Sequence, residues 1–223
     1  MKIIFLSDFQ RRNNDPSFVQ RVVDIVNENN PDLILLGGDY IANTFSELAS
    51  IEPLREMESR FGTLAVMGNH DYGVFMYHPE KVYVVTAKQI EEFLTANSTI
   101  QFLSNQNVKF ENVTVIGLDS YWSGLRDDTK AKRSNEDFTI VLTHNQDDLE
   151  INKENADLYL FGHTHCGQVR LPGIGSVPKL LGFRGTYDYQ YYFVNDVHVY
   201  ATCGLAPAPR FLNPPEITII NLN

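Results

Sequence analysis

The sequence contains only two cysteines, Cys166 and Cys203, and they form no C-x-x-C pair. Two cysteines are too few for the disulfide framework that stabilises many small secreted domains. We therefore expect the chain to fold in a reducing compartment with both thiols unpaired.

Long hydrophobic runs are also missing. No window approaches the roughly 18 apolar residues that a membrane-spanning helix needs. The N-terminus passes from Met1 and Lys2 directly into a short apolar run, without the pattern of a signal peptide. These absences predict a cytoplasmic protein without a transmembrane segment, with peripheral contact with a membrane as the remaining alternative.

Basic residues are few. The chain carries 18 Lys and Arg against 28 Asp and Glu, a net charge of -10, and its only dense basic cluster is KAKR at 130–133. Binding to a nucleic-acid backbone would lack its main electrostatic term, so we expect no nucleic-acid partner. A small-molecule or lipid-linked phosphoester fits this charge balance better as a substrate.

The apolar segments that are present predict an α/β fold. Five short runs that end in polar or glycine-containing loops predict buried strands: residues 2–7, 32–38, 62–68, 138–143 and 156–162. Three segments favour helices: 15–30, with Asp15 as N-cap and Pro16 in the first turn, 44–59, with a kink at Pro53, and 86–97. Hairpins over 108–119 and 189–202 and a final strand in EITIINL complete one domain, 1–223, built as a sandwich of two mixed sheets with helices outside.

Polar residues with metal-binding side chains follow each of the five strands. They are, in chain order, Asp8, Asp39, Asn69 with His70, His144, and His163 with His165. Because ligands bind at the carboxyl ends of strands in open α/β sheets, this placement brings dispersed residues onto one rim. Each residue alone could be a helix cap, a turn residue or a surface histidine. The ordered set, with glycine beside Asp39, Asn69 and His163, favours a shared site.

This ordered set resembles the calcineurin-like metallophosphoesterase superfamily, whose sequence blocks run D-x-H, G-D, G-N-H-D/E, H and G-H-x-H. The resemblance implies a four-layer α/β/β/α sandwich that holds two divalent metal ions, for which we expect Mn²⁺, with Fe, Zn, Ni and Mg as alternatives. It implies a first metal held by Asp8, Gln10, Asp39 and His165, and a second held by Asp39, Asn69, His144 and His163. Two such ions can polarise a phosphoryl group and activate water.

Four further residues receive roles from this resemblance. His70 would face the substrate and stabilise or protonate the leaving oxygen, with Asp71 either orienting it or serving a turn. GHTHCGQ (162–168) and PRFLNPPE (209–216) resemble a branch of phosphodiesterases related to UDP-2,3-diacylglucosamine pyrophosphatase. There Arg210 would contact a substrate phosphate or fix the NPPE turn, Cys166 would be an inert thiol or a soft ligand, and residues 171–192 would line the site or form a plain connection.

Gln10 stands where the superfamily has histidine. A glutamine oxygen is a weaker donor than imidazole toward transition metals, so we expect the first metal to bind more weakly than the second.

The ordered site residues and the resemblance together predict that the chain is a phosphodiesterase or pyrophosphatase. The alternatives are a non-catalytic metal-binding scaffold and, disfavoured by the acidic charge, a DNA-repair nuclease.

Overall fold

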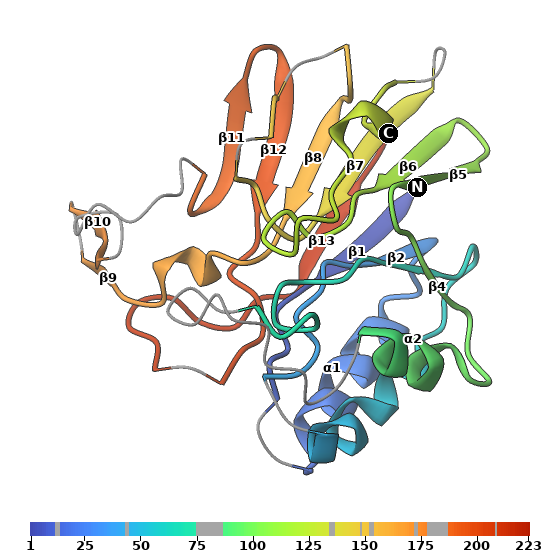
Figure 1. The fold of residues 1–223 in the computed structure, drawn as a ribbon, viewed down its shortest axis with the longest axis vertical. Coiled ribbons are helices and arrows are strands. Elements are labelled where there is room, and N and C mark those ends of the chain that lie inside the picture. The colour runs from blue at the N-terminus through green and yellow to red at the C-terminus, as the bar shows by residue number, and fades with distance from the viewer. Residues whose placement is uncertain are drawn as a thin grey trace.

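The computed structural model describes residues 1–11, 14–42, 45–74, 87–133, 137–147, 149–151, 154–171, 174–177, 187–207 and 209–223. Two mixed β-sheets pack face to face, and helices cover the outer face of one of them (Figure 1). This arrangement confirms the predicted α/β class with two mixed sheets and helices.

The first sheet has the strand order β13-β1-β2-β3-β4. Its strands are β1 (Lys2–Leu6), β2 (Leu33–Leu36), β3 (Thr63–Ala65), β4 (Ile100–Phe102) and β13 (Thr218–Asn221). The four strands from β1 to β4 run parallel, and β13 adds to β1 in the antiparallel sense at the edge. The runs at 2–7, 32–38 and 62–68 therefore form the predicted strands, whereas β4 was not predicted.

The second sheet has the order β11-β12-β8-β7-β6-β5. Its strands are β5 (Gln106–Phe110), β6 (Val113–Gly117), β7 (Phe138–Thr143), β8 (Leu158–Phe161), β11 (Gln190–Val194) and β12 (Val197–Ala201). The two predicted hairpins are β5-β6 and β11-β12, and they supply the antiparallel edges of a parallel centre. A separate two-stranded ribbon joins β9 (Arg170–Leu171) to β10 (Gly175–Ser176).

Three helical segments cover the first sheet: α1 (Ser17–Glu28), the 3₁₀ segment η1 (Phe45–Glu56) and α2 (Ala87–Thr95). The predicted cap of α1 is wrong by one position, because Pro16 occupies the N-cap. Asp15 instead accepts hydrogen bonds from the backbone N–H and the hydroxyl of Ser17. Pro53 lies inside η1, where the tighter 3₁₀ winding replaces the predicted kinked helix.

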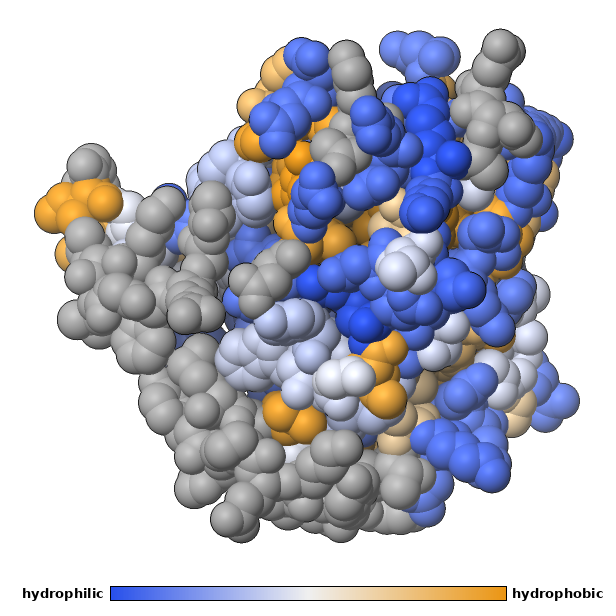
Figure 2. All heavy atoms as spheres, turned by 45° about the horizontal axis from the view of Figure 1, so that its top comes forward, coloured by the Kyte–Doolittle hydropathy of each residue, from blue (hydrophilic) through white to orange (hydrophobic). Residues whose placement is uncertain are grey.

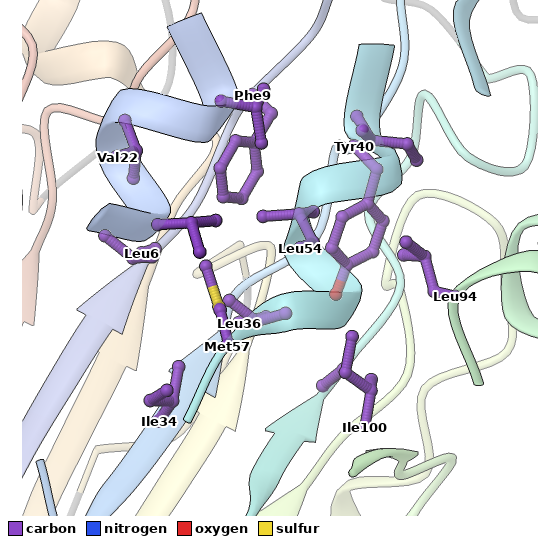
Figure 3. Packing of buried hydrophobic residues seen from close by; sticks show 14 of the residues in the cluster. Leu6, Phe9, Val22, Ile34, Leu36, Tyr40, Leu54, Met57, Leu94 and Ile100 are labelled. Carbon is purple, nitrogen blue, oxygen red and sulfur yellow. The ribbon is translucent and has the colours of Figure 1, made fainter. Parts of the chain in front are cut away.

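The helices bury the outer face of the first sheet. Side chains from alternate strand positions, such as Leu6, Ile34 and Leu36, point toward residues of the helices, and Tyr40 lies among them (Figure 3). The hydroxyl of Tyr40 donates to the carbonyl of Val66, which satisfies the polar end of a fully buried ring. The opposite faces of β1 and β2 meet the second sheet in a separate apolar cluster.

The outer face of the second sheet carries a further apolar layer. Its buried residues, among them Val141, Tyr159 and Phe161, pack against Ala131, Ile151 and Ala156 from loops. Within the described residues that cover this face lie the short 3₁₀ turn η2 (Asp128–Lys130) and loops. The described part of the chain thus has the two sheets and the helical layer of the predicted sandwich.

Hydrophilic residues dominate the described surface on the face shown in Figure 2, and hydrophobic residues there occur in separate places. This pattern agrees with the excess of acidic residues in the sequence. None of the helices in the described ranges has the length and apolar character to cross a membrane.

The intersheet cluster makes a direct prediction about stability. Leu35 is fully buried between the sheets, whereas Ile219 on the edge strand β13 is 46% exposed. We expect Leu35→Ala to lower the free energy of unfolding by about 2–5 kcal/mol, because it removes buried methyl groups and leaves a cavity. The matched variant Ile219→Ala should change it by less than about 1 kcal/mol. Equal effects in urea denaturation of the two variants would contradict this packing.

Candidate metal centre

The predicted site residues lie where the strands of both sheets end. Asp8 follows β1, Asp39 follows β2, His144 follows β7, and His163 and His165 follow β8. The backbone turns sharply at these points, with positive φ angles of 57° at Asp8, 57° at Asp39, 68° at His163 and 49° at His165. Residues with side chains rarely adopt this region, and such strain concentrates at functional sites.

Two carboxylates and two imidazoles approach one another closely. One ligand atom each from Asp8, Asp39 and His144 lie within 4.8 Å of one another, and all three residues are buried. Nε2 of His144 is 3.2 Å from Asp39 Oδ2 and 3.9 Å from Asp8 Oδ1. Nε2 of His165 is 3.5 Å from Asp8 Oδ1. The fold thus brings together residues that lie up to 157 positions apart in the sequence.

Backbone amides hold the two carboxylates in place. The N–H of His163 donates to both oxygens of Asp8, at 3.0 and 3.2 Å, and the N–H of His70 donates to Asp39 Oδ1 at 2.9 Å. Glycine permits this close approach, since a Cβ on Gly68 would clash with the Asp39 carboxylate and one on Gly204 would lie 2.7 Å from Asp8 Cβ.

Asp71 contacts the backbone of two loops. Its buried carboxylate accepts hydrogen bonds from the backbone N–H groups of Asp39, Tyr40 and Gly68, at 2.8 to 2.9 Å. Burial, followed by the charge of Asp39, raises the pKa of Asp71 to about 7. The structure therefore places Asp71 as a support of the loops after β2 and β3, in line with the turn role considered from the sequence, and an orienting role toward His70 stays a prediction.

His144 is oriented by a backbone carbonyl. Its Nδ1 lies 2.7 Å from the carbonyl oxygen of Gly37, which directs Nε2 toward the carboxylates. Burial alone would lower the pKa of His144, but the negative charge of Asp39 outweighs it and raises the pKa to about 9. The same pairing holds the pKa of Asp39 far below its ordinary value although burial opposes this shift.

The two histidines of the GHTH block are neutral. Burial, followed by the charge of His144, lowers the pKa of His163 to about 3. Burial also lowers the pKa of His165. The ring of His163 packs edge to face against Trp122 and His144, with centroids 4.5 and 5.2 Å apart. Neutral imidazoles are the form that binds metal ions.

Asn69 is oriented through its amide. Its Nδ2 donates to the carbonyl of Val74 at 2.7 Å, so its Oδ1 faces the other way. Asn145 Nδ2 lies 3.4 Å from that oxygen, and Asn145 Oδ1 accepts from the hydroxyl of Ser120. Asn145 was not given a role from the sequence, although its position directly after His144 places it at the same strand end.

Gln10 is buried beside Asp39. Its Nε2 donates to Asp39 Oδ2 at 2.8 Å, the same oxygen that His144 approaches. The amide thus presents N–H to the carboxylate, where the sequence predicted an amide oxygen directed at a metal. A carboxylate accepts hydrogen bonds and donates none, which explains this orientation.

His70 faces the same carboxylate from the outer side. Its Nε2 is 4.0 Å from Asp39 Oδ2, its Nδ1 is 3.0 Å from the carbonyl oxygen of Ala42, and 26% of its side chain is exposed. This partial exposure distinguishes His70 from the buried His144, and it allows a solvent-borne molecule to reach the ring.

Arg210 is engaged with the backbone of its own loop. Its guanidinium donates to the carbonyls of Ala206, Asn213 and Gly204, at 3.2 to 3.4 Å. These contacts with backbone carbonyls fix the turn before NPPE. Contact with a substrate phosphate stays a prediction.

The two cysteines form a disulfide, which corrects the prediction of unpaired thiols. β8 and β12 are parallel neighbours, so the segments that follow them bring Cys166 and Cys203 together. Closing a loop with a sequence separation of 37 residues contributes on the order of 4 kcal/mol in the chain-entropy model. The expectation of a reducing compartment rested on unpaired thiols and loses that support.

The donor set fits a divalent metal ion. Nε2 of His144 and Nδ1 of His165 are buried and make no hydrogen bond within the described ranges. Two fully buried carboxylates lie beside them, and uncompensated buried charge is strongly unfavourable. Carboxylate oxygens with imidazole nitrogens are a ligand set of Mn²⁺, Fe²⁺ and Zn²⁺. His78 and, within the segment 171–192, residues 172, 173 and 178–186 lie outside the described residues.

The pairing of His144 with Asp39 makes metal binding dependent on pH. With a pKa raised to about 9, His144 carries a proton at pH 7, and this proton must leave when the ring binds a metal. We expect release of about one proton on metal binding and an affinity that rises with pH up to about 9. Calorimetric titration with Mn²⁺ in buffers of different ionisation enthalpy measures this release. Identical enthalpies in all buffers would contradict it, and His144→Asn should abolish this contribution.

Comparisons with known proteins agree with this geometry. The profile of the calcineurin-like phosphoesterase family matches residues 1–167. An uncharacterized metallophosphoesterase of Helicobacter pylori strain 26695 is 31% identical over 238 residues, which cover 100% of this chain and 60% of that longer protein. Phosphodiesterase YaeI of Escherichia coli K12 is 31% identical over 241 residues, covering 99% of this chain and 82% of YaeI.

Two more distant proteins are similar to this chain over most of its length. UDP-2,3-diacylglucosamine pyrophosphatase LpxG of Chlamydia muridarum is 22% identical over 277 residues, covering 99% of this chain and 83% of LpxG. The structure of phosphopantetheinyl hydrolase PptH from Mycobacterium tuberculosis has a TM-score of 0.52 at 10% identity, covering 92% of this chain and 90% of that one, which concerns the fold alone. The family match and the similarity to YaeI establish that this chain belongs to the calcineurin-like phosphoesterases, a family of metallophosphoesterase hydrolases.

Proposed function

We propose that the protein is a divalent-metal-dependent phosphohydrolase of the phosphodiesterase or pyrophosphatase type. The observation that carries this proposal is the buried cluster of Asp8, Asp39 and His144, whose ligand atoms lie within 4.8 Å of one another. The predicted ligands His163 and His165 lie against the same cluster, and the family match covers all of these residues. Two divalent ions are the proposed cofactors, with Mn²⁺ first among them.

Bound divalent ions would polarise the phosphoryl group and lower the pKa of a water molecule. The chain's own residues supply the rest. Asp8 and Asp39 provide negative charge that balances the cations, and the N–H groups of His163 and His70 keep both carboxylates fixed. His70, with its Nδ1 on the carbonyl of Ala42, can hold a proton at Nε2 and deliver it to the leaving oxygen of the substrate.

The type of phosphoester follows from the relatives. YaeI is named a phosphodiesterase and LpxG a pyrophosphatase, and both relationships cover 99% of this chain. The leaving oxygen of either substrate accepts a proton, which the partly exposed imidazole of His70 can deliver. We therefore favour a diester or pyrophosphate over a phosphomonoester.

Gln10 supports a second candidate function, a non-catalytic scaffold that binds at most one metal. The amide of Gln10 donates to Asp39 Oδ2, an oxygen that the two-metal arrangement would use for a cation. Rotation of the amide by 180° would present its oxygen instead, and this rotation would have to accompany binding of the first metal. The remaining ligand set favours the enzyme.

The enzyme proposal is tested by hydrolysis of a generic diester. Protein stripped of metal and reloaded with Mn²⁺ should hydrolyse bis-p-nitrophenyl phosphate, and Asp39→Asn should lower turnover about 100-fold or more because it weakens the binding of both ions. His70→Ala should lower kcat about 100-fold at unchanged metal content. Ile219→Ala, on the exposed edge strand, serves as control. Absence of turnover with Mn²⁺, Mg²⁺, Zn²⁺, Fe²⁺ and Ni²⁺ on any generic phosphoester would exclude the enzyme.

The first metal should respond to the residue at position 10. We expect Gln10→His to tighten Mn²⁺ binding at this position by about tenfold, because an imidazole nitrogen is a stronger donor than an amide oxygen. Calorimetric titration of the metal-free protein measures both ions separately. Gln10→Ala is the matched control, since it removes the amide without adding a ligand. Equal Mn²⁺ affinities of the wild type and Gln10→His would refute this account of Gln10.

A further inference from the structure

The turn that carries His165 has an unusual backbone. His165, Cys166, Gly167 and Gln168 have successive φ angles of 49°, 53°, 73° and 54°, all in the left-handed region. Three of these four residues carry a Cβ, which makes the conformation unfavourable for an isolated chain. Contacts from elsewhere in the fold must therefore hold this turn in place.

Those contacts come from the segment 203–213. Cys203 forms the disulfide with Cys166, and the side-chain Nδ2 of Asn213 donates to the backbone carbonyl of His165 at 2.7 Å. Phe211 exchanges backbone hydrogen bonds with Gln168 and Arg170 at 3.1 and 3.2 Å. The two segments lie side by side in Figure 1, the turn in orange and the segment 203–213 in red.

The same segment also contacts Asp8. The backbone N–H of Leu205 lies 3.1 Å from the carbonyl oxygen of Ser7 and 3.2 Å from that of Asp8. Gly204 packs so closely that an added Cβ would lie 2.7 Å from Asp8 Cβ. Cys166 directly follows His165, and Cys203 directly precedes Gly204, which packs against Asp8. The disulfide therefore joins the turn that carries His165 to the segment that contacts Asp8. His165 Nε2 and Asp8 Oδ1 are 3.5 Å apart.

Asp8, Gln10 and His165 are the three predicted ligands that serve only the first metal, and Gln10 offers only an amide to it. The affinity of a metal site with fewer strong donors depends more on how firmly the remaining ligands are held in place. We propose that the Cys166–Cys203 disulfide and the Asn213 side chain position His165 and thereby set the affinity of the first metal. This inference rests on the proposed two-metal function.

The contacts that hold the turn at His165, the Cys166–Cys203 disulfide and the Asn213 hydrogen bond, depend on residues that lie largely beyond the part of the chain that the family profile matches. The match ends at residue 167, whereas Cys203 and Asn213 belong to the C-terminal segment. The disulfide is buried, with Cys166 at 0% and Cys203 at 2% exposure, and Asn213 is 2% exposed. These residues therefore act on the ligand from the interior and need no contact with substrate.

The test uses the double variant Cys166→Gly with Cys203→Ser. Glycine accepts the positive φ at position 166, so the variant removes the sulfur link without adding backbone strain. Calorimetric titration of metal-free protein with Mn²⁺ should show the weaker ion bound about tenfold less tightly and the stronger ion unchanged within about twofold. Asn213→Ala should weaken the same ion, by about threefold, with the disulfide intact.

Two controls separate positioning from a general loss of stability. Leu35→Ala also lowers the melting temperature but lies on β2, away from this turn, and both of its ions should bind as in the wild type. In the Gln10→His background the cysteine variant should weaken the first metal by less than it does in the wild-type background, because a fourth strong donor makes this metal less dependent on the disulfide. A disulfide that only stabilises the fold would not weaken one ion selectively.

The outcomes are distinguishable. Unchanged affinities for both ions in the cysteine variant and in Asn213→Ala would overturn the positioning role, as would equal weakening of both ions. Wild-type protein that takes up fewer than two ions would contradict the proposed function itself, and the inference with it. Selective weakening of one ion, smaller in the Gln10→His background than in the wild-type background, is the expected result.

Discussion

The structure depends on the burial of two neighbouring carboxylates, Asp8 and Asp39, at the ends of adjacent parallel strands. Buried negative charges are strongly unfavourable unless hydrogen bonds and positive charge compensate them. Much of the surrounding architecture supplies this compensation: backbone N–H groups point at the carboxylates, glycines allow close approach, and imidazoles lie within 4 Å. The same fixed carboxylates and imidazoles are suited to binding divalent cations.

Asp71 shows how the compensation extends outward. Its carboxylate ties together the backbone after β2 and after β3, and its own pKa is raised by burial and by the charge of Asp39. A carboxylate in this position stabilises the loops at the expense of adding a third acidic group near the site. The GNHD block therefore combines the proposed ligand Asn69, the proposed proton donor His70 and the structural support Asp71.

Sequence reasoning recovered the parts of the site that depend on strand ends. Asp8, Asp39, His144 and His165 could be placed together because parallel strands end on one rim, and the two hairpins followed from their turn residues. The disulfide could not be recovered, because it depends on the parallel pairing of β12 with β8, which joins distant segments. The role of Asp71 and the direction of the Gln10 amide depend on side-chain geometry that spacing does not encode.

The left-handed turn at His165 has a consequence for the order of assembly. Asp8 is synthesised long before Cys203 and Asn213, which hold the facing residue His165. Contacts between such distant segments form late, because a long loop must close first. A growing chain therefore carries Asp8, Asp39, His144 and His165 before the turn at His165 is held in its final shape, and this turn is fixed only when the segment 203–213 folds against it.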